Sequence, residues 1–184
     1  MDAGMRGGMR RATVADAAAI ARIHVETWRT TYAGILPDHY LVGLHRGRQA
    51  AGWRRTLASD RGGKLTLVME EAGTGIVGFA SGGPARPAEL PRGSDVRGEV
   101  YTLYVGSDWQ GNGYGRALLQ GVIANLRAND LGGVIAWVLA ASPTRFFYEA
   151  MGGVRLASRR ERFAGTELDE LGYVWRDAPA DPAD

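Results

Sequence analysis

A chain of 184 residues is long enough to bury one full hydrophobic core and too short to suggest two domains. Its 45% hydrophobic and 23% charged residues are typical of a soluble globular domain, and no apolar run approaches the roughly 18 residues of a membrane-spanning helix. The lack of cysteine excludes disulfides, thiolate metal sites and an acyl-cysteine intermediate. The Gly- and Arg-rich start has no apolar stretch like that of a signal peptide, so we expect a cytoplasmic protein.

The charge of the chain is nearly balanced, since 22 Lys and Arg against 20 Asp and Glu give a formal net charge of +2. Lys64 is the only lysine, and the arginines are scattered except for Arg159, Arg160 and Arg162. This distribution lacks the basic stripe of a nucleic-acid surface, and we expect no nucleic-acid partner. The small surplus of arginine suits a ligand that carries phosphate groups.

The N-terminal half combines a short strand with helices and a hairpin. Thr13 is placed to cap a helix whose apolar residues, from Ala18 to Trp28, recur with helical spacing. The Gly62–Gly63 pair separates the helical part from two β-prone runs. We predict a strand at 9–12, helices at 14–31, 37–44 and 46–59, and a hairpin of strands 64–70 and 75–82.

The C-terminal half begins with the longest loop, residues 83–97, which is rich in proline and glycine. We then predict a strand at 98–105, a helix at 114–128, a strand at 134–139, a helix at 143–151 and a hairpin of strands 154–163 and 168–175. This order predicts a single α/β (α+β) domain, in which one mixed sheet of about seven strands is flanked by helices.

The segment from Gly98 to Ile123 carries the chemistry. A predicted strand ends near Val105, and Gly111, Gly113 and Gly115 then open the predicted helix. Glycines at such a turn let backbone N–H groups approach a ligand closely, and the helix N-terminus adds unpaired donors and a partial positive charge. Together these features form a pyrophosphate cradle that needs no lysine.

Other nucleotide motifs fit this turn less well. A Walker A loop needs Gly-Lys followed by Ser or Thr, whereas Gly115 is followed by Arg116 and Ala117. A dinucleotide fingerprint that starts at Gly111 needs a glycine where Arg116 stands. The G-x-G-x-G of S-adenosylmethionine methyltransferases is matched, but in those enzymes the glycines follow the strand directly, and here residues 106–110 intervene.

Gln110, Gly113 and Gly115 form the pattern Q-x-x-G-x-G, which an ordinary turn in a chain with 27 glycines also produces. The surroundings favour a motif, because the preceding strand carries Glu99 early, the helix continues as RALL, and residues 135–154 follow as strand and helix. In this order the sequence resembles the acetyl-CoA-binding region of the GNAT family of N-acetyltransferases. The resemblance implies one domain over residues 9–176 with flexible ends at 1–8 and 177–184.

The resemblance also implies acetyl-CoA as cosubstrate and a central sheet in which two strands splay apart, so that the pantetheine arm adds like a strand. The family motif F-Y-E-x-x-G is matched from Phe147 to Gly152. Where the family often has Asn after the second splayed strand, this chain has Ala141 or Ser142, and Ser142 is the candidate replacement. The implied cofactor-binding residues are Leu103, Tyr104, Val105, Gln110, Gly111, Asn112, Gly113, Tyr114, Gly115, Arg116, Ser142 and Phe147.

Acetyl transfer to an amine needs a group that takes the amine's proton, because an alkylammonium with a pKa near 10.4 is neutral in only about one of 2,500 molecules at pH 7. In the family a Glu early in the first splayed strand acts as base, often through water, and Glu99 matches it. Tyr148 matches the general acid that protonates the leaving sulfur, and a backbone N–H near Val105 would stabilise the oxyanion. The alternatives are a Glu99 that faces solvent at a strand edge and a Tyr148 that only packs.

The acceptor site is expected near residues 28–41, which resemble a frequent N-terminal signature of the family. Trp28 and Tyr32 lie four apart on one helix face, where they would either wall the amine pocket through cation–π contacts or staple two helices together. His24, His39 and His45 lack ligand-like spacing with carboxylates. We expect them to be surface or packing residues, and we expect no metal site.

The prediction is therefore an N-acetyltransferase that acts directly on a primary amine, more on a small molecule than on a protein, because no recognition domain is appended. Nucleic acids and membranes are not expected partners, and the final hairpin is a candidate homodimer contact. Two alternatives come from other classes. A methyltransferase would bind S-adenosylmethionine instead, and a non-catalytic acyl-CoA-binding sensor would keep the glycine turn without base and acid.

Overall fold

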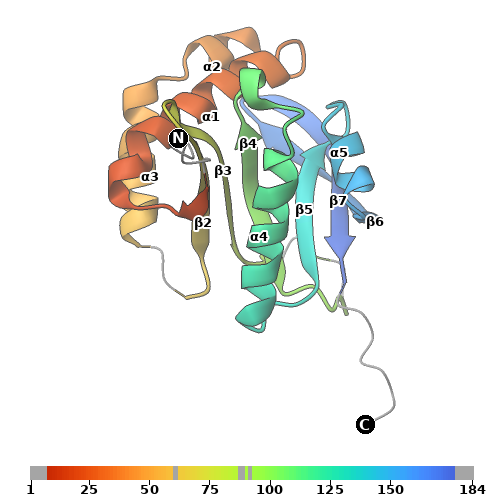
Figure 1. The fold of residues 1–184 in the computed structure, drawn as a ribbon. Coiled ribbons are helices and arrows are strands. Elements are labelled where there is room, and N and C mark those ends of the chain that lie inside the picture. The colour runs from red at the N-terminus through yellow and green to blue at the C-terminus, as the bar shows by residue number, and fades with distance from the viewer. Residues whose placement is uncertain (1–7, 60–61, 87–89, 91–92, 177–184) are drawn as a thin grey trace.

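A computed structural model describes residues 8–59, 62–86, 90 and 93–176 (Figure 1). The flexible ends expected at 1–8 and 177–184 therefore fall outside the described residues, except for Gly8, whose carbonyl accepts the Glu70 N–H at 3.0 Å. The elements are β1 (Met9–Arg11), α1 (Ala17–Thr31), α2 (Asp38–Val42), α3 (Arg46–Ala58), β2 (Leu65–Glu71), β3 (Gly75–Pro84), β4 (Gly98–Val105), α4 (Tyr114–Ala128), β5 (Val134–Leu139), α5 (Arg145–Ala150), β6 (Val154–Phe163) and β7 (Thr166–Trp175).

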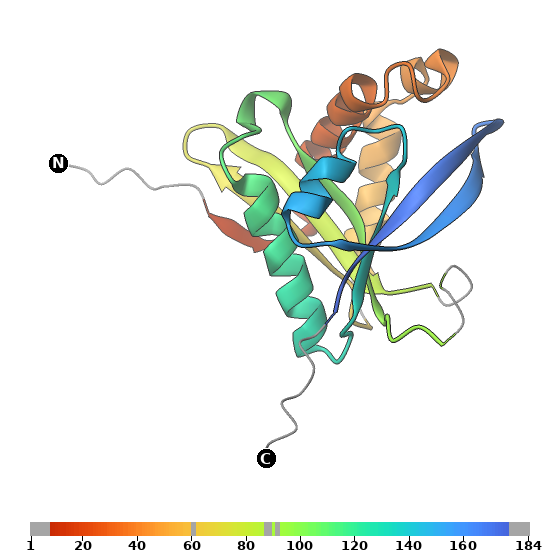
Figure 2. The same cartoon turned by 90° about the vertical axis from the view of Figure 1, so that its right-hand side faces the viewer.

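The seven strands form one sheet in the order β1-β2-β3-β4-β5-β7-β6. All neighbours pair antiparallel except β4 and β5, which are parallel because α4 carries the chain back across the sheet. Helices α1 and α3 cover one face of the sheet, and α4 and α5 cover the other (Figures 1 and 2). The predicted α/β domain with a mixed sheet of about seven strands is thus confirmed.

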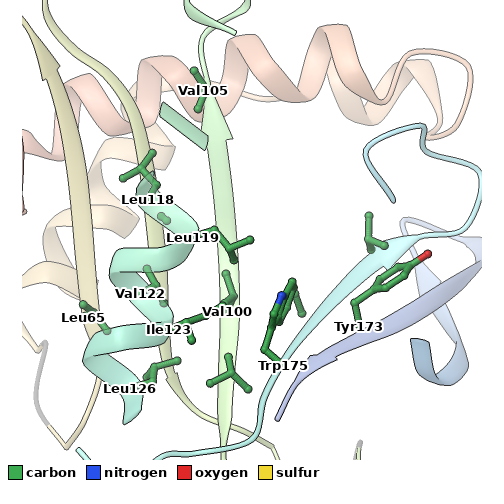
Figure 3. Packing of buried hydrophobic residues seen from close by; sticks show 14 of the residues in the cluster. Leu65, Val100, Val105, Leu118, Leu119, Val122, Ile123, Leu126, Tyr173 and Trp175 are labelled. Carbon is green, nitrogen blue, oxygen red and sulfur yellow. The ribbon is translucent and has the colours of Figure 1, made fainter. Parts of the chain in front are cut away.

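Strands β4 and β5 pair over only three positions, Gly98↔Val134, Glu99↔Ile135 and Val100↔Ala136. Beyond them β5 stays bonded to β7, and β4 stays bonded to β3, so the two strands diverge towards their carboxyl ends. Figure 3 shows β5 leaning away from β4 in this way. The sheet is therefore split along part of its length.

A β-bulge marks the point at which β4 leaves β5. Ser81 on β3 pairs with Thr102, whereas the next residue, Gly82, pairs with Val100, so Tyr101 is an extra residue on β4. Bulges bend a strand and increase its local twist. The bulge at Tyr101 accounts for the separation that begins after Val100.

The larger core lies between α4 and the sheet. Its α4 residues recur at helical spacing and are buried against β2–β5 and β7: Leu118, Leu119, Val122, Ile123 and Leu126 (Figure 3). Close contact depends on Gly82, since a Cβ there would lie 2.6 Å from Val122 Cγ1 and 2.9 Å from the Glu99 carbonyl oxygen. This packing fixes α4, and hence the turn before it, relative to β4.

The predicted elements match the observed ones closely, with small differences at their ends. The first predicted helix begins as a 3₁₀ turn, Val14–Asp16, because Asp16 accepts the Thr13 N–H at 2.7 Å and also binds Arg10 at 2.8 Å. The last strand begins at Thr166, two residues before its predicted start, because the β6–β7 turn is tight. Among the described residues, no helix has the length and apolarity needed to cross a membrane.

Candidate active site

The divergence of β4 and β5 opens a cavity of about 110 Å³, here called the narrow cavity. Strand β4 supplies one wall, β5 the other, and residues from α1, the glycine turn and α5 close it. Its lining residues are Thr27, Thr31, Tyr32, Val100, Tyr101, Thr102, Leu103, Tyr104, Val105, Gln110, Trp137, Val138, Thr144 and Tyr148. The expected cofactor residues Leu103, Tyr104, Val105 and Gln110 are among them.

The backbone of β4 faces this cavity with polar groups. The Gly106 N–H donates to the Val77 carbonyl at 2.9 Å and so points towards β3. Because successive residues of a strand turn their polar groups to opposite sides, those of Val105 and Leu103 point towards the cavity. Gln110 Nε2 donates to the Val105 carbonyl at 3.1 Å. A strand edge of this kind is a template for hydrogen bonds to an extended ligand.

The glycine turn beside the cavity presents backbone donors. Gly111 and Gly113 have φ of 79° and 82°, the left-handed conformation that residues with a side chain rarely adopt. The first helical hydrogen bond of α4 runs from the Ala117 N–H to the Gly113 carbonyl at 3.0 Å. The amides of residues 114–116 therefore precede the helical ladder, at the positive end of the helix dipole. Such an arrangement of amides can bind an anion, which is the chemistry that the glycine pattern predicts.

The remaining residues of the turn hold its shape. Asn112 Nδ2 donates to the Trp109 carbonyl at 3.2 Å, and the Tyr114 hydroxyl donates to Glu71 at the end of β2. Gly115 lies beside Phe147, since a Cβ there would make an ordinary contact with the Phe147 ring at 3.4 Å. Arg116 is exposed on the first turn of α4. Gly111 to Arg116 and Phe147 do not line the narrow cavity, and the turn joins it through Gln110.

Ser142 does not face the narrow cavity. Its side chain is buried, and its hydroxyl lies 2.8 Å from that of Thr144. Thr144, just before α5, lines the cavity in its place. Sequence reasoning missed Thr144, although its position at the helix start, directly after Pro143, is a recognisable signal.

Tyr148 enters the narrow cavity from α5. Its ring stacks on Tyr173 with centroids 6.3 Å apart, and burial raises the pKa of its hydroxyl, with a smaller effect from Tyr32. A phenol keeps its proton at neutral pH, so this group can donate a hydrogen bond, and the raised pKa makes it a weaker acid than an exposed tyrosine. Tyr173 donates to Glu149 at 2.6 Å, which fixes α5 against β7.

A second, wide cavity of about 400 Å³ adjoins the narrow one. Both cavities share the lining residues Tyr32, Tyr101, Tyr104, Trp137 and Val138. Further walls come from α1, the segment before α2 and the β6–β7 hairpin, including Trp28, Leu36 and Phe163. Trp28 and Tyr32, expected to lie side by side, have ring centroids 5.2 Å apart and line this cavity together.

Glu99 lies at the paired end of β4 and is buried, with 3% of its side chain exposed. Arg86 covers it: Arg86 Nη2 lies 2.6 Å from Oε1, while the Arg86 backbone N and Nε lie 3.4 Å from Oε2. Arg86 has 54% of its side chain exposed and lines the wide cavity. Glu99 is therefore not a solvent-facing edge residue, because the guanidinium of Arg86 lies between its carboxylate and the wide cavity.

The histidines are packing or surface residues, as expected. His24 stacks on Tyr104 with centroids 5.4 Å apart, and its Nδ1 accepts the Trp53 Nε1–H at 3.2 Å. Burial lowers the pKa of His24 to about 4, so it is neutral at neutral pH. His39 and His45 are exposed. Within the described residues, no group of three or more His, Asp or Glu side chains is placed to hold a metal ion.

Comparisons with known proteins agree with one another. Residues 20–152 match the model of the acetyltransferase (GNAT) family. The chain is 34% identical over 172 residues to the N-acetyltransferase YuaI of Bacillus subtilis, with 94% of each chain covered. The ribosomal-protein-alanine N-acetyltransferase of Brucella melitensis is similar in structure, with 28% identity, a TM-score of 0.65 and coverage of 92% of this chain and 99% of that one. The structure of yncA from Salmonella typhimurium, solved with its cofactor acetyl-CoA, has 25% identity, a TM-score of 0.68 and coverage of 96% and 97%.

The burial of His24 predicts a specific loss of stability in mild acid. Between pH 6.5 and about 4 the unfolded chain binds a proton at His24 that the folded protein does not, so the free energy of unfolding falls as the pH falls. His24→Gln keeps an acceptor for Trp53 and removes this proton. Over that interval the wild type should lose roughly 3 kcal/mol more than the variant, measured by urea unfolding. Equal losses in the two proteins would contradict the neutral, buried state of His24.

Proposed function

Because this chain belongs to the acetyltransferase (GNAT) family and is an N-acetyltransferase, we propose that it transfers the acetyl group of acetyl-CoA directly to a primary amine of a small molecule. The resemblance drawn from Gln110, Gly113 and Gly115 is thereby confirmed at the level of the family. The methyltransferase and sensor alternatives are set aside on the same finding. The observation that carries the proposal is the narrow cavity beside the glycine turn.

The residues of the narrow cavity fit acetyl-CoA. The backbone groups of Leu103 and Val105 on the β4 edge would form hydrogen bonds with the amide groups of a pantetheine arm, which would add to the sheet like a strand. The amides of residues 114–116 suit a pyrophosphate. The relative yncA binds acetyl-CoA as its cofactor, which supports the same assignment here. Acetyl-CoA supplies the activated acetyl group, and this chain holds and orients it.

The wide cavity fits the acceptor. Its volume of about 400 Å³ lies within the range of small-molecule sites, and Trp28, Tyr32 and Phe163 provide apolar walls. The two cavities meet at Tyr32, Tyr101 and Tyr104, so an amine there reaches a thioester held along β4. The Brucella melitensis relative, a ribosomal-protein-alanine N-acetyltransferase, favours a protein N-terminus as the second candidate acceptor. Release of CoA from a panel of small amines and N-terminal peptides distinguishes the two.

Three groups would carry the reaction. Glu99 takes the amine's proton, either through water or after Arg86 moves aside, because Arg86 stands between it and the wide cavity. A backbone N–H in the Leu103–Val105 stretch stabilises the oxyanion. Tyr148, a phenol that is protonated at neutral pH and lines the narrow cavity, donates to the leaving sulfur.

Acetyl-CoA should raise the thermal midpoint of unfolding, since a ligand that binds only the folded state stabilises it by about 2.7 kcal/mol at 100 times Kd. Gly113→Val should abolish this stabilisation, because a branched side chain strains the left-handed turn that presents the amides. Gly165→Val is the matched control: Gly165 has a similar φ of 84° but lies in the β6–β7 turn. A stabilisation by S-adenosylmethionine and none by acetyl-CoA would refute the cofactor assignment.

Tyr148→Phe should lower kcat by about 10²-fold or more while the Kd of acetyl-CoA changes little, because only the proton for the sulfur is lost. Tyr173→Phe is the matched control, since it removes the other phenol of the same ring stack, whose hydroxyl binds Glu149. The control should lose stability and keep kcat. Unchanged turnover of Tyr148→Phe, where chemistry limits the rate, would make Tyr148 a packing residue.

Glu99→Gln should lower kcat/KM by about 10²- to 10⁴-fold near neutral pH and recover towards wild type at high pH, where more of the amine is already neutral. Acetyl-CoA binding should stay intact. Arg86→Gln tests whether Glu99 acts as a base or only positions Arg86. If Glu99 only positions Arg86, the two variants should have the same pH–rate profile. A profile of Glu99→Gln parallel to wild type, or a loss below about threefold, would move the base role elsewhere.

A further inference from the structure

One wall of the wide cavity is a charged cluster on the β6–β7 hairpin, formed by Arg159, Glu161 and Glu170. The hairpin projects from the body of the protein (Figure 2). Arg159 Nε and Nη2 each lie 2.6 Å from Glu170 Oε2, and Nη2 lies 3.1 Å from Glu161 Oε2. The guanidinium carbon lies 4.2 Å from the centre of the Trp137 ring. Arg159 is thus fixed between two carboxylates and an indole.

The cluster leaves an excess of negative charge in the cavity. Its two carboxylates share one guanidinium, so the three side chains together carry one negative charge. The other arginine of the cavity, Arg86, is already ion-paired with Glu99. In a partly desolvated cavity this imbalance favours a cationic ligand.

Of the two carboxylates, Glu170 is the one that is placed to bind a cation inside the cavity. Only 18% of its side chain is exposed, against 49% for Glu161 at the rim. Arg159 Nε and Nη2 both contact the same oxygen of Glu170, Oε2. Glu170 also lines the wide cavity, so a ligand there can engage its carboxylate.

Glu170 also lies close to the place where the two cavities meet. It pairs with Leu139 at the diverging end of β5, and both residues line the wide cavity. Burial raises the pKa of Tyr32, a hydrogen bond with Tyr104 lowers it, and the charge of Glu170 raises it slightly. Tyr32 belongs to both cavities, so a cation at Glu170 would lie near the site proposed for acetyl transfer.

We propose that Glu170 determines which acceptor this enzyme takes, by binding the amine in its ammonium form, so that the acceptors are alkyl amines with an apolar body. This inference rests on the proposed function. Trp28, Phe163 and Leu168 supply the apolar and aromatic surface for such a body, including cation–π contact with the charged group. Arg159 and the Trp137 ring beneath it position Glu170 and limit how tightly the ammonium binds.

The test compares benzylamine, a cation at neutral pH, with benzyl alcohol, a neutral molecule of nearly the same shape. Binding is followed by quenching of tryptophan fluorescence in protein saturated with CoA. The wild type should prefer benzylamine by about 10- to 100-fold, the usual size of a charge-assisted hydrogen bond. Glu170→Gln should remove the preference. Glu167→Gln is the matched control, because Glu167 pairs with Arg160, which is 67% exposed, and does not line the wide cavity.

Equal or undetectable binding of the two compounds to the wild type would overturn the proposal, and so would a preference that survives Glu170→Gln. Should Glu170→Gln fail to fold, Arg159→Gln provides the second test: removal of the competing cation should strengthen the preference for benzylamine. A weaker preference would contradict it. Failure of the proposed function is seen separately, as an absence of stabilisation by acetyl-CoA or of CoA release with any amine.

Discussion

The site depends on the point at which the backbone hydrogen bonding between β4 and β5 stops. After Val100 the inner edge of β4 has lost its neighbour and lines the narrow cavity instead. A backbone group that is kept from water and has no partner costs about 1–3 kcal/mol, so such an edge persists only where the surrounding structure enforces it. Here α4 holds β4 against β3, β7 holds β5, and the bulge at Tyr101 sets the angle between them. An extended ligand that completes the ladder relieves this cost, which links the fold directly to cofactor binding.

Most of the frame could be predicted from the sequence. Gly98–Val105, Tyr114–Ala128 and Val134–Leu139 begin and end as predicted, because a glycine stands at or just before the start of each and the apolar pattern stops at its end. Contacts between segments that are distant in the sequence could not be predicted. The ion pair of Arg86 with Glu99 depends on how a long loop folds back. Thr144, and not Ser142, lines the narrow cavity, because the turn after β5 directs the Thr144 hydroxyl towards it. Glu170 lies in a hairpin with charges on both faces, where no pattern separates the residues that face a cavity.

Two arginine–carboxylate pairs border the wide cavity and differ in a way that matters for chemistry. In the first, the carboxylate is buried and the guanidinium is exposed, so Arg86 screens Glu99. In the second, both partners are mostly buried and the guanidinium is also bound to Glu161, so the pair acts as a rigid part of the wall. Breaking either pair leaves a carboxylate with little exposure uncompensated. The pairs differ in the cation, because the guanidinium of Arg86 already contacts water, whereas that of Arg159 is held inside the wall.

The three-residue seam between β4 and β5 also distributes the linings of the two cavities unevenly over the sheet. The part up to α4 carries the glycine turn and the open strand edge, while β5–β7 carry Trp137, Arg159 and Glu170. Substitutions without shared contacts usually have additive effects. Arg159 and Glu170 line the wide cavity and not the narrow one, so substitutions at these two positions leave the lining of the narrow cavity unchanged. The split sheet thus gives the hairpin positions that can vary separately from the open edge of β4.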